Sequence, residues 1–433
     1  MESSQDISNN RPLNDGQKSY YIARMKAAWA KLPADKKKAL RPALDEAHQQ
    51  YTDFLNQQIP PEHKFHNILR MKSYLTDDWD QQLQSHDQRI EAAAIEITLG
   101  PEGEILGTGK YEQLDPCWEL VAGTVWLENL LYKHPFPTGT PPIIPLQVLP
   151  NEKLRIALAG DFGTGNFGAN DSPSTRISKI IRTLQPHITI HLGDVYYAGT
   201  GPEETSKLVN CWPSGSLHSF TLNSNHEMYS GGGPYFNEAV GGPLFNMSQS
   251  PWSFFAFEYG NWIVVGLDSA YYSGVMDLYM NGSLGNSAQL SFLKTMAQKG
   301  KKVIVLTHHH GFELDGTKSN QLYDEVMSAF HNVPPPAYWY WGHKHAGAVY
   351  KPMNGTRFRC TGHAALPWGF SSQLAGSSQV EWFEKKKAGS PDESMRVFNG
   401  FTMLELDADN LTETFYDELG RIAWTPSSGD TRG

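Results

Sequence analysis

The stretch Leu158-Ala-Gly-Asp161-Phe-Gly163-Thr-Gly165 ends an apolar run and opens a glycine-rich turn. The run from Leu154 predicts a buried strand, and the carboxyl ends of such strands are where α/β sheets place their chemistry. Taken alone, a Gly-Asp pair after a strand is as typical of a simple turn. The stretch also lacks the Gly-Lys-Ser/Thr of a nucleotide-binding loop. Asp161 therefore indicates a site only if other strand ends carry matching chemistry.

Four later stretches carry it, each after an apolar, β-branched or aromatic run that predicts a strand. They are His191-Leu-Gly-Asp194-Val-Tyr-Tyr197, Asn223-Ser-Asn225-His226-Glu227, Val305-Leu-Thr-His308-His309-His310 and Trp341-Gly-His343-Lys-His345. Five polar clusters at five strand ends can converge on one rim of a sheet. Their carboxylates, amide, phenol and imidazoles form a ligand set for two adjacent hard or borderline cations.

In order, these motifs read Asp-x-Gly, Gly-Asp-x-x-Tyr, Asn-His-Glu, Val-x-x-His and Gly-His-x-His. This series resembles the calcineurin-like metallophosphoesterases and, within them, the purple acid phosphatase branch, over roughly Leu154 to Leu419. The resemblance implies an α/β fold, a four-layer αββα sandwich of two mixed sheets. One departure is Ser224, where the family usually has glycine. Because serine adopts a strongly positive φ less easily, we expect the ligand loop to sit slightly differently.

The resemblance also implies which residues hold two metal ions, with Asp194 bridging them. On one side it places Asp161, Tyr197 and His345, and on the other Asn225, His308 and His343. The alternative for His343 and His345 is a pair of loop histidines satisfied by neighbouring groups. The presence of all the other motifs favours the ligand interpretation.

Tyr197 and Gly163 support each other in this interpretation. Most relatives have Asp-x-His, and Gly163 occupies the position of that histidine. Tyr197 stands where the purple branch places its tyrosine. A phenol has a pKa of about 10, so it binds best to a cation charged strongly enough to displace its proton. We therefore expect Fe(III) beside Tyr197 and Fe, Mn or Zn in the second position. The alternative is that Tyr197 is a core aromatic residue beside Tyr196.

By resemblance, His226 is a catalytic and substrate-binding residue that orients the phosphate or protonates the leaving oxygen. Glu227 is a candidate to fix its tautomer. Asn225 and His309 are further candidates for substrate binding, although a supporting role is an equal alternative for His309. Asp268 is a candidate to orient a ligand histidine or to cap a turn.

The reaction that follows is hydrolysis of a small-molecule phosphate ester by a hydroxide held on the metals. The first hypothesis is an acid phosphatase-like phosphomonoesterase. The second is a phosphodiesterase acting on cyclic nucleotides or lipid-derived diesters. The third is a non-catalytic scaffold that has lost its metals, which the seven competent ligand types disfavour.

Composition narrows the class further. The 433 residues carry a formal net charge of −10, which argues against nucleic-acid binding but not against a phosphate substrate. Cys117, Cys211 and Cys360 are widely spaced and predict buried thiols. The start of the chain has no signal-peptide pattern, and no apolar run approaches about 18 residues, so we expect a cytoplasmic protein without a membrane span. The oligomeric state is left open.

The chain before the motifs predicts a separate N-terminal region, residues 1–145, followed by a catalytic domain over 150–425. Helical patterns run from Tyr20 to about Gln58, and residues 91–99 and 105–111 suggest a hairpin. Prolines between Pro135 and Pro145 predict an extended linker. The region is expected to be a cap, docking or oligomerisation element, and the later residues to form a soluble, metal-binding fragment without it.

Overall fold

The computed structural model describes residues 15–42, 98–107, 109–113, 115–168, 171–285, 288–389, 395–427 and 429. The predictions for residues 43–97, including the first strand of the hairpin up to residue 97, lie outside the described residues.

The first large sheet has six strands in the order β16-β15-β14-β4-β5-β6. Its three strands β4, β5 and β6 run parallel, and β14, β15 and β16 add to the β4 edge in antiparallel pairs. The bounds are β4 Leu154–Ala159, β5 Ile188–His191, β6 His218–Thr221, β14 Gly400–Leu406, β15 Leu411–Asp417 and β16 Ile422–Trp424.

The second sheet has eight strands in the order β13-β11-β12-β10-β9-β8-β7-β3. Strands β8, β9, β10 and β12 run parallel in its centre. The bounds are β3 Ile143–Pro145, β7 Phe255–Tyr259, β8 Trp262–Leu267, β9 Lys302–Thr307, β10 Tyr338–Trp341, β11 Gly347–Tyr350, β12 Arg357–Thr361 and β13 Val380–Phe383. Both sheets are therefore mixed.

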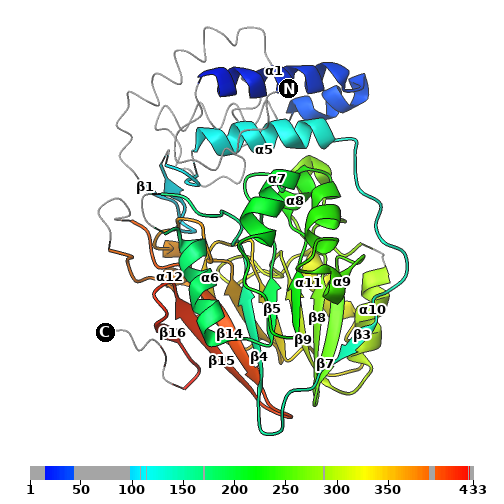
Figure 1. Ribbon diagram of the computed structural model, residues 1–433, viewed down its shortest axis with the longest axis vertical. Helices are drawn as coiled ribbons and strands as arrows, with labels where there is room; N and C mark the ends of the chain where they lie inside the picture. The colour runs from blue at the N-terminus through cyan, green and yellow to red at the C-terminus, as the bar shows by residue number, and fades with distance from the viewer. Residues whose placement is uncertain are drawn as a thin grey trace.

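Alternating side chains of the central strands build three layers of apolar packing. Ile156 and Leu158 face the second sheet in a core that also contains Ile304 and Leu306. Ala157 of the same strand packs outward on helix α6, Pro173–Leu184. Outward-facing side chains of β9 pack against α10, Ala288–Ala297, and α11, Gln321–Ser328. The expected four-layer sandwich is confirmed, and Figure 1 shows its helices outside the sheets.

Shorter helical segments lie in the connections. They are α7 Gly201–Glu203, η1 Glu204–Val209, α8 Asn225–Tyr229, η2 Tyr235–Val240, α9 Asn246–Gln249, η3 Val275–Asp277 and α12 Ser372–Gly376. Helix α8 begins at the Asn-His motif.

The N-terminal region packs directly on the sandwich. Helix α1, Asp15–Lys31, lies along α5, Pro116–Asn129, and residues 34–42 are also helical (Figure 1). Buried α5 side chains such as Val121 and Trp126 belong to one core with Ala198 and Met228, which lie close in sequence to the Gly-Asp and Asn-His motifs. The proline-rich segment ends in β3, which pairs with β7, so it is not a linker between two separate cores. Strands β1, Thr98–Leu99, and β2, Ile105–Leu106, form a short hairpin.

This shared core changes the result expected from truncation. Deleting residues 1–140 removes α5, whose large apolar side chains each contribute roughly 1.5–3 kcal/mol when buried. The structure argues against the soluble fragment expected from sequence, and we now expect an aggregating product. Soluble yield of the 141–433 fragment measures this, with a deletion of residues 1–14 as the control that leaves α5 in place. A soluble, monodisperse 141–433 fragment would contradict the shared core.

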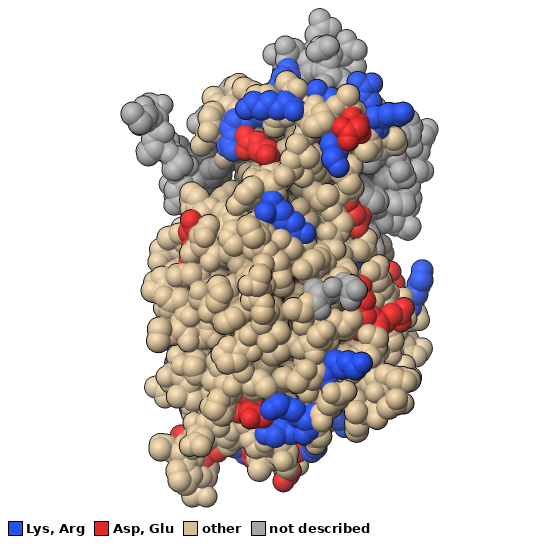
Figure 2. Space-filling model, turned by 90° about the vertical axis from the view of Figure 1, so that its right-hand side faces the viewer, with Lys and Arg blue, Asp and Glu red and all other residues tan. Residues whose placement is uncertain are grey.

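The surface provides two further observations. Among the described residues, no helix combines the length and apolarity needed to cross a bilayer. On the face drawn in Figure 2, Lys and Arg residues are scattered among Asp and Glu, and the described residues form no broad basic patch there.

Candidate metal centre

The predicted ligands come from the ends of five central strands. Asp161 follows β4, Asp194 follows β5 and Asn225 lies just beyond β6, while His308 and His343 follow β9 and β10. The carboxyl ends of these parallel strands meet at the side of the molecule where α8 and α5 lie (Figure 1). The convergence expected from the spacing of the motifs is therefore present.

Three of these residues hold an unusual backbone conformation. The φ angles of Asp161, Asp194 and His343 are 59°, 80° and 62°. Non-glycine residues rarely adopt positive φ, and such conformations persist only where the surrounding structure enforces them. Their concentration on three residues of one cluster makes this rim the candidate functional site.

One half of the cluster brings hydrogen-bond acceptors face to face. The Nδ1–H of His308 donates to the Leu192 carbonyl at 2.8 Å, which leaves a lone pair on Nε2. That nitrogen lies 3.0 Å from Asn225 Oδ1 and 3.2 Å from Asp194 Oδ1. The amide nitrogen of Asn225 donates to the Tyr229 hydroxyl at 3.0 Å, so its oxygen faces the cluster. His343 Nδ1 approaches the same oxygen at 3.2 Å. These oxygen and nitrogen atoms are close enough together to hold one cation between them.

The other half shares Asp194 with the first. His345 Nε2 lies 3.3 Å from Asp161 Oδ1 and 4.0 Å from Asp194 Oδ2. The Tyr196 hydroxyl lies between them, 3.2 Å from Asp161 Oδ1, 2.7 Å from Asp194 Oδ2 and 3.1 Å from His345 Nε2. The two oxygens of Asp194 face different halves, so this carboxylate would help to hold both cations. The donor set fits the two-metal centre that the motifs predict.

Burial puts the imidazoles in the form that binds metals. It lowers the pKa of His308 and, well below the usual value, that of His343, and it lowers the pKa of His345 to about 3. Burial and the nearby Asp194 charge raise the pKa of Asp161. Burial would also raise the pKa of Asp194, but any positive charge on the His308 and His226 rings lowers it overall. Imidazoles bind a metal in their neutral form, which the lowered pKa values of His308, His343 and His345 favour.

The structure does not bring Tyr197 into this cluster. Its hydroxyl donates to Asp115 Oδ2 at 2.6 Å, in contact with the N-terminal region, and its side chain is buried there. The preceding residue, Tyr196, supplies the phenol oxygen next to Asp161 and Asp194. The expectation that Tyr197 is a ligand therefore needs correction. Tyr197 is instead a core aromatic residue, which was the alternative. Both rings pack against Trp118, and the physical reason for the difference is that the Tyr197 hydroxyl is held by Asp115.

Gly163 has a clear steric role. A Cβ atom there would lie 2.5 Å from the Asp194 carbonyl oxygen and 2.6 Å from the Val195 Cα. The Gly163 carbonyl also accepts from the Tyr196 backbone N–H at 2.9 Å. A histidine at this position is excluded by the backbone, and the same close approach holds the Tyr196 loop beside Asp161.

His226 is held so that one ring nitrogen faces the cluster. Its Nδ1 lies 2.6 Å from the Tyr197 carbonyl, which requires a proton on that nitrogen, and Nε2 lies 4.0 Å from Asp194 Oδ2. The rings of Tyr196 and Tyr229 lie 4.5 and 4.9 Å from it. Glu227, the residue expected to fix its tautomer, instead accepts from the Asp194 N–H and from the Ser224 hydroxyl. The Tyr197 carbonyl therefore fixes the tautomer of His226, which was the role expected of Glu227.

Ser224 meets no conformational difficulty. Its φ is −136°, and its hydroxyl accepts from the His226 N–H as the N-cap of α8. The loop does not use a positive φ at this residue, so the reason for expecting a displaced loop is absent. Serine adds a cap that glycine lacks.

Two other candidates are used by the protein itself. The ring nitrogens of His309 lie 2.9 Å from Ser269 Oγ and 2.8 Å from the Tyr279 carbonyl, which leaves neither for a substrate. Its ring lies 4.7 Å from that of His343 and supports it, contrary to the substrate-binding expectation. Asp268 accepts from the backbone N–H groups of Ala270 and Tyr271 and is a turn cap.

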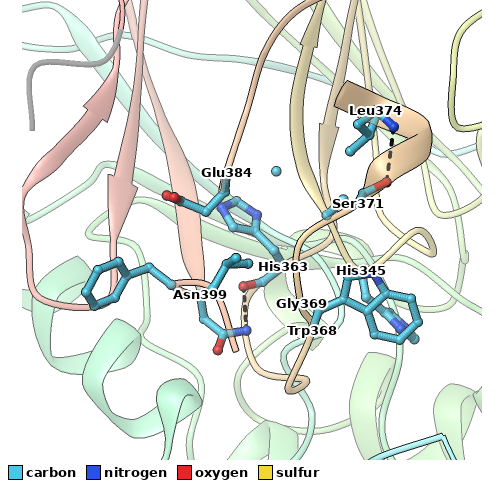
Figure 3. Close-up of a pocket in the computed structure, with 12 residues that line it drawn as sticks. His345, His363, Trp368, Gly369, Ser371, Leu374, Glu384 and Asn399 are labelled. Carbon is cyan, nitrogen blue, oxygen red and sulfur yellow. Dashed lines mark hydrogen bonds between the residues drawn. The ribbon is translucent and has the colours of Figure 1, made fainter. Parts of the chain in front are cut away.

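Sequence reasoning missed the residues that enclose the rim. Trp368 lies with its ring 4.6 Å from His345, and its indole donates to the Glu102 carbonyl. The Glu102 carboxylate pairs with Lys344 at 2.7 Å. Figure 3 shows Trp368 beside His345, with His363 and Glu384 on the far side of a cavity of about 10 Å³. These partners are distant in sequence, so spacing carried no signal for them.

One comparison with known proteins covers the part of the chain that carries the strand-end motifs. Residues 154–347 match the family model described as calcineurin-like phosphoesterase. The matched segment includes all the strand-end motifs. A comparison with curated proteins finds no match.

Among solved structures, similar chains include GAP50, described as the anchor in the inner membrane complex of Plasmodium, with 15% identity, 65% of this chain and 90% of that chain covered, and a TM-score of 0.43. A dimetal phosphatase from Danio rerio has 14% identity, coverage of 61% and 96%, and a TM-score of 0.41. The zinc complex of Vps29 from Entamoeba histolytica has 13% identity, coverage of 62% and 95%, and a TM-score of 0.27. Likenesses this distant say nothing about the activity of this chain.

Proposed function

We propose that this protein is a phosphomonoesterase that works with two metal ions. The observation that carries the proposal is the convergence of acceptor atoms on the two sides of Asp194. When bound, the ions activate a water molecule and neutralise charge on the phosphoryl oxygens. We assign Asp161, Asp194, Tyr196 and His345 to one ion and Asp194, Asn225, His308 and His343 to the other. A phenol ligand favours Fe(III) in the first position.

Within this proposal, His226 handles the proton of the leaving group. Its Nδ1–H is committed to the Tyr197 carbonyl, so only Nε2 can deliver a proton toward the cluster. The rings of Tyr196 and Tyr229 fix the plane of the imidazole and keep water away from it. In its doubly protonated form the ring can give the Nε2 proton to the departing alkoxide and keep the Nδ1 proton on the Tyr197 carbonyl.

The recessed position of the cluster supports a monoester as the substrate. Asp161, Asp194 and His308 are at most 1% exposed. A monoester carries one substituent and can enter such a site phosphate first, whereas a diester must fit a second one. The test is a panel of phosphate monoesters and diesters, assayed on protein of measured metal content. A preference for diesters would show that the substrates are diesters and not monoesters. Inactivity of the two-metal protein on every ester would overturn the proposal.

The assignment of Tyr196 makes a spectroscopic prediction. A phenolate bound to Fe(III) absorbs visible light, so we expect iron-loaded protein to be coloured. Tyr196→Phe should lose the band, since it removes the oxygen between Asp161 and Asp194. Tyr197→Phe should keep the band and lose about 1–3 kcal/mol of stability through its missing hydrogen bond to Asp115. Visible absorption and thermal unfolding of both variants decide between the rings, and loss of colour in Tyr197→Phe alone would restore the first expectation.

A further inference from the structure

The N-terminal region reaches the candidate metal centre through Trp118, in the first turn of α5. Its ring lies 5.6 Å from that of His226 and 5.3 Å from that of Tyr196. The side chain is 6% exposed, and its indole N–H has no acceptor among the described residues. A donor group is thus buried beside the residue that faces the cluster.

An indole without an acceptor is not informative by itself. The indole N–H of Trp341 also has no acceptor among the described residues, but Trp341 packs in the outer core with Tyr350 and Phe358. Trp118 differs because its neighbours are the proposed proton donor and the proposed phenol ligand. Where a buried donor adjoins a site for an anion, the anion can supply the missing acceptor.

The position of Trp118 is fixed by contacts to the loop that carries Asp194. Asp115 caps α5 by accepting from the Cys117 N–H, and its other oxygen accepts from the Tyr197 hydroxyl. The Tyr197 carbonyl in turn binds His226 Nδ1. Tyr197 therefore contacts both Asp115, which caps the start of α5, and the imidazole of His226. This linkage sets the distance between Trp118 and His226, as expected of a preorganised binding site.

We propose that Trp118 is a substrate-binding residue whose Nε1–H donates a hydrogen bond to a phosphoryl oxygen of the substrate. The inference rests on the function proposed above and gives the N-terminal region a role in that site. Hydrogen bonds to charged groups are stronger than neutral ones, so loss of this bond has a measurable effect on the affinity for phosphate.

The test compares two tryptophans of α5. Trp118→Phe keeps an aromatic ring and removes the N–H. Trp126→Phe is the matched control, since the indole of Trp126 donates to the Val275 carbonyl at 3.1 Å in the same core. Calorimetric titration of the metal-loaded proteins with inorganic phosphate should show affinity weakened roughly 10- to 100-fold in Trp118→Phe. The control should bind as the wild type does. Equal affinity in Trp118→Phe and the control would overturn the inference.

A second measurement does not depend on how well the variant folds. In zinc-loaded wild-type protein labelled with ¹⁵N, phosphate should shift the indole resonance of Trp118, assigned by selective labelling. An unshifted resonance at saturating phosphate would overturn the proposal. Phosphate binding through Trp118 without hydrolysis of any ester would instead overturn the proposed activity and leave this inference standing.

Discussion

Asp194→Asn should abolish phosphatase activity, with a loss on the order of 10³-fold or more, because one carboxylate serves both halves of the cluster. Its two oxygens lie 3.2 Å from His308 Nε2 and 2.7 Å from the Tyr196 hydroxyl. The amide is a weaker ligand and adds a donor where two cations are expected. Metal content by mass spectrometry should fall together with turnover.

The same substitution should behave differently in stability measurements. Without metal, the wild type holds acceptors against one another, and an amide N–H at residue 194 can donate to His308 Nε2. We expect the metal-free variant to melt at the same temperature as the metal-free wild type or above it, as is common when functional groups are replaced. Asp171→Asn, at a surface ion pair with Lys179, is the control. A variant with two metals and near-native turnover would contradict the bridging role.

His226→Ala should lower turnover by about 10²–10⁴, the usual contribution of a positioned acid–base group, with metal content near that of the wild type. The reason is geometric. Its Nε2 faces the cluster at 4.0 Å from Asp194, outside the close contacts made by His308 and His345. The effect should shrink for esters with good leaving groups, which need less protonation.

The control for His226 is His218→Ala, because that ring bonds to Ser248 Oγ at the far end of β6. Steady-state rates across a series of leaving groups, together with metal analysis, separate the possible outcomes. Loss of metal in His226→Ala would make His226 a ligand. A uniform loss of rate across all leaving groups would show that it positions the phosphate and donates no proton.

Much of the fold was predictable because its information is local. The strand prediction for residues 338–341 matches β10, since an aromatic run stops at a glycine. The apolar run from Leu154 likewise predicted β4, whose side chains point in turn to the inner core and to α6. Edge strands β13 and β16 were missed because both are short and depend on pairing with a neighbour.

The ligand types at the strand ends were also readable from sequence, since chemistry and strand-end position together restrict what Asp161, Asp194 and His308 can do. Their convergence follows from parallel strands that end at one rim. This logic applies to residues attached directly to a strand. The same reasoning fails for residues further along the loops, because rotation about the backbone there changes the direction of a side chain.

Only the tertiary structure decided which tyrosine faces the cluster. Tyr196 and Tyr197 are adjacent, and the partner that holds the second ring, Asp115, is 82 residues away. His309 was likewise removed from the substrate side by the Tyr279 carbonyl, 30 residues distant. Trp118 lies on a helix without any motif, and its proposed role depends on its packing beside His226. Each of these outcomes depends on contacts between distant segments, and such contacts leave no periodic trace in the chain.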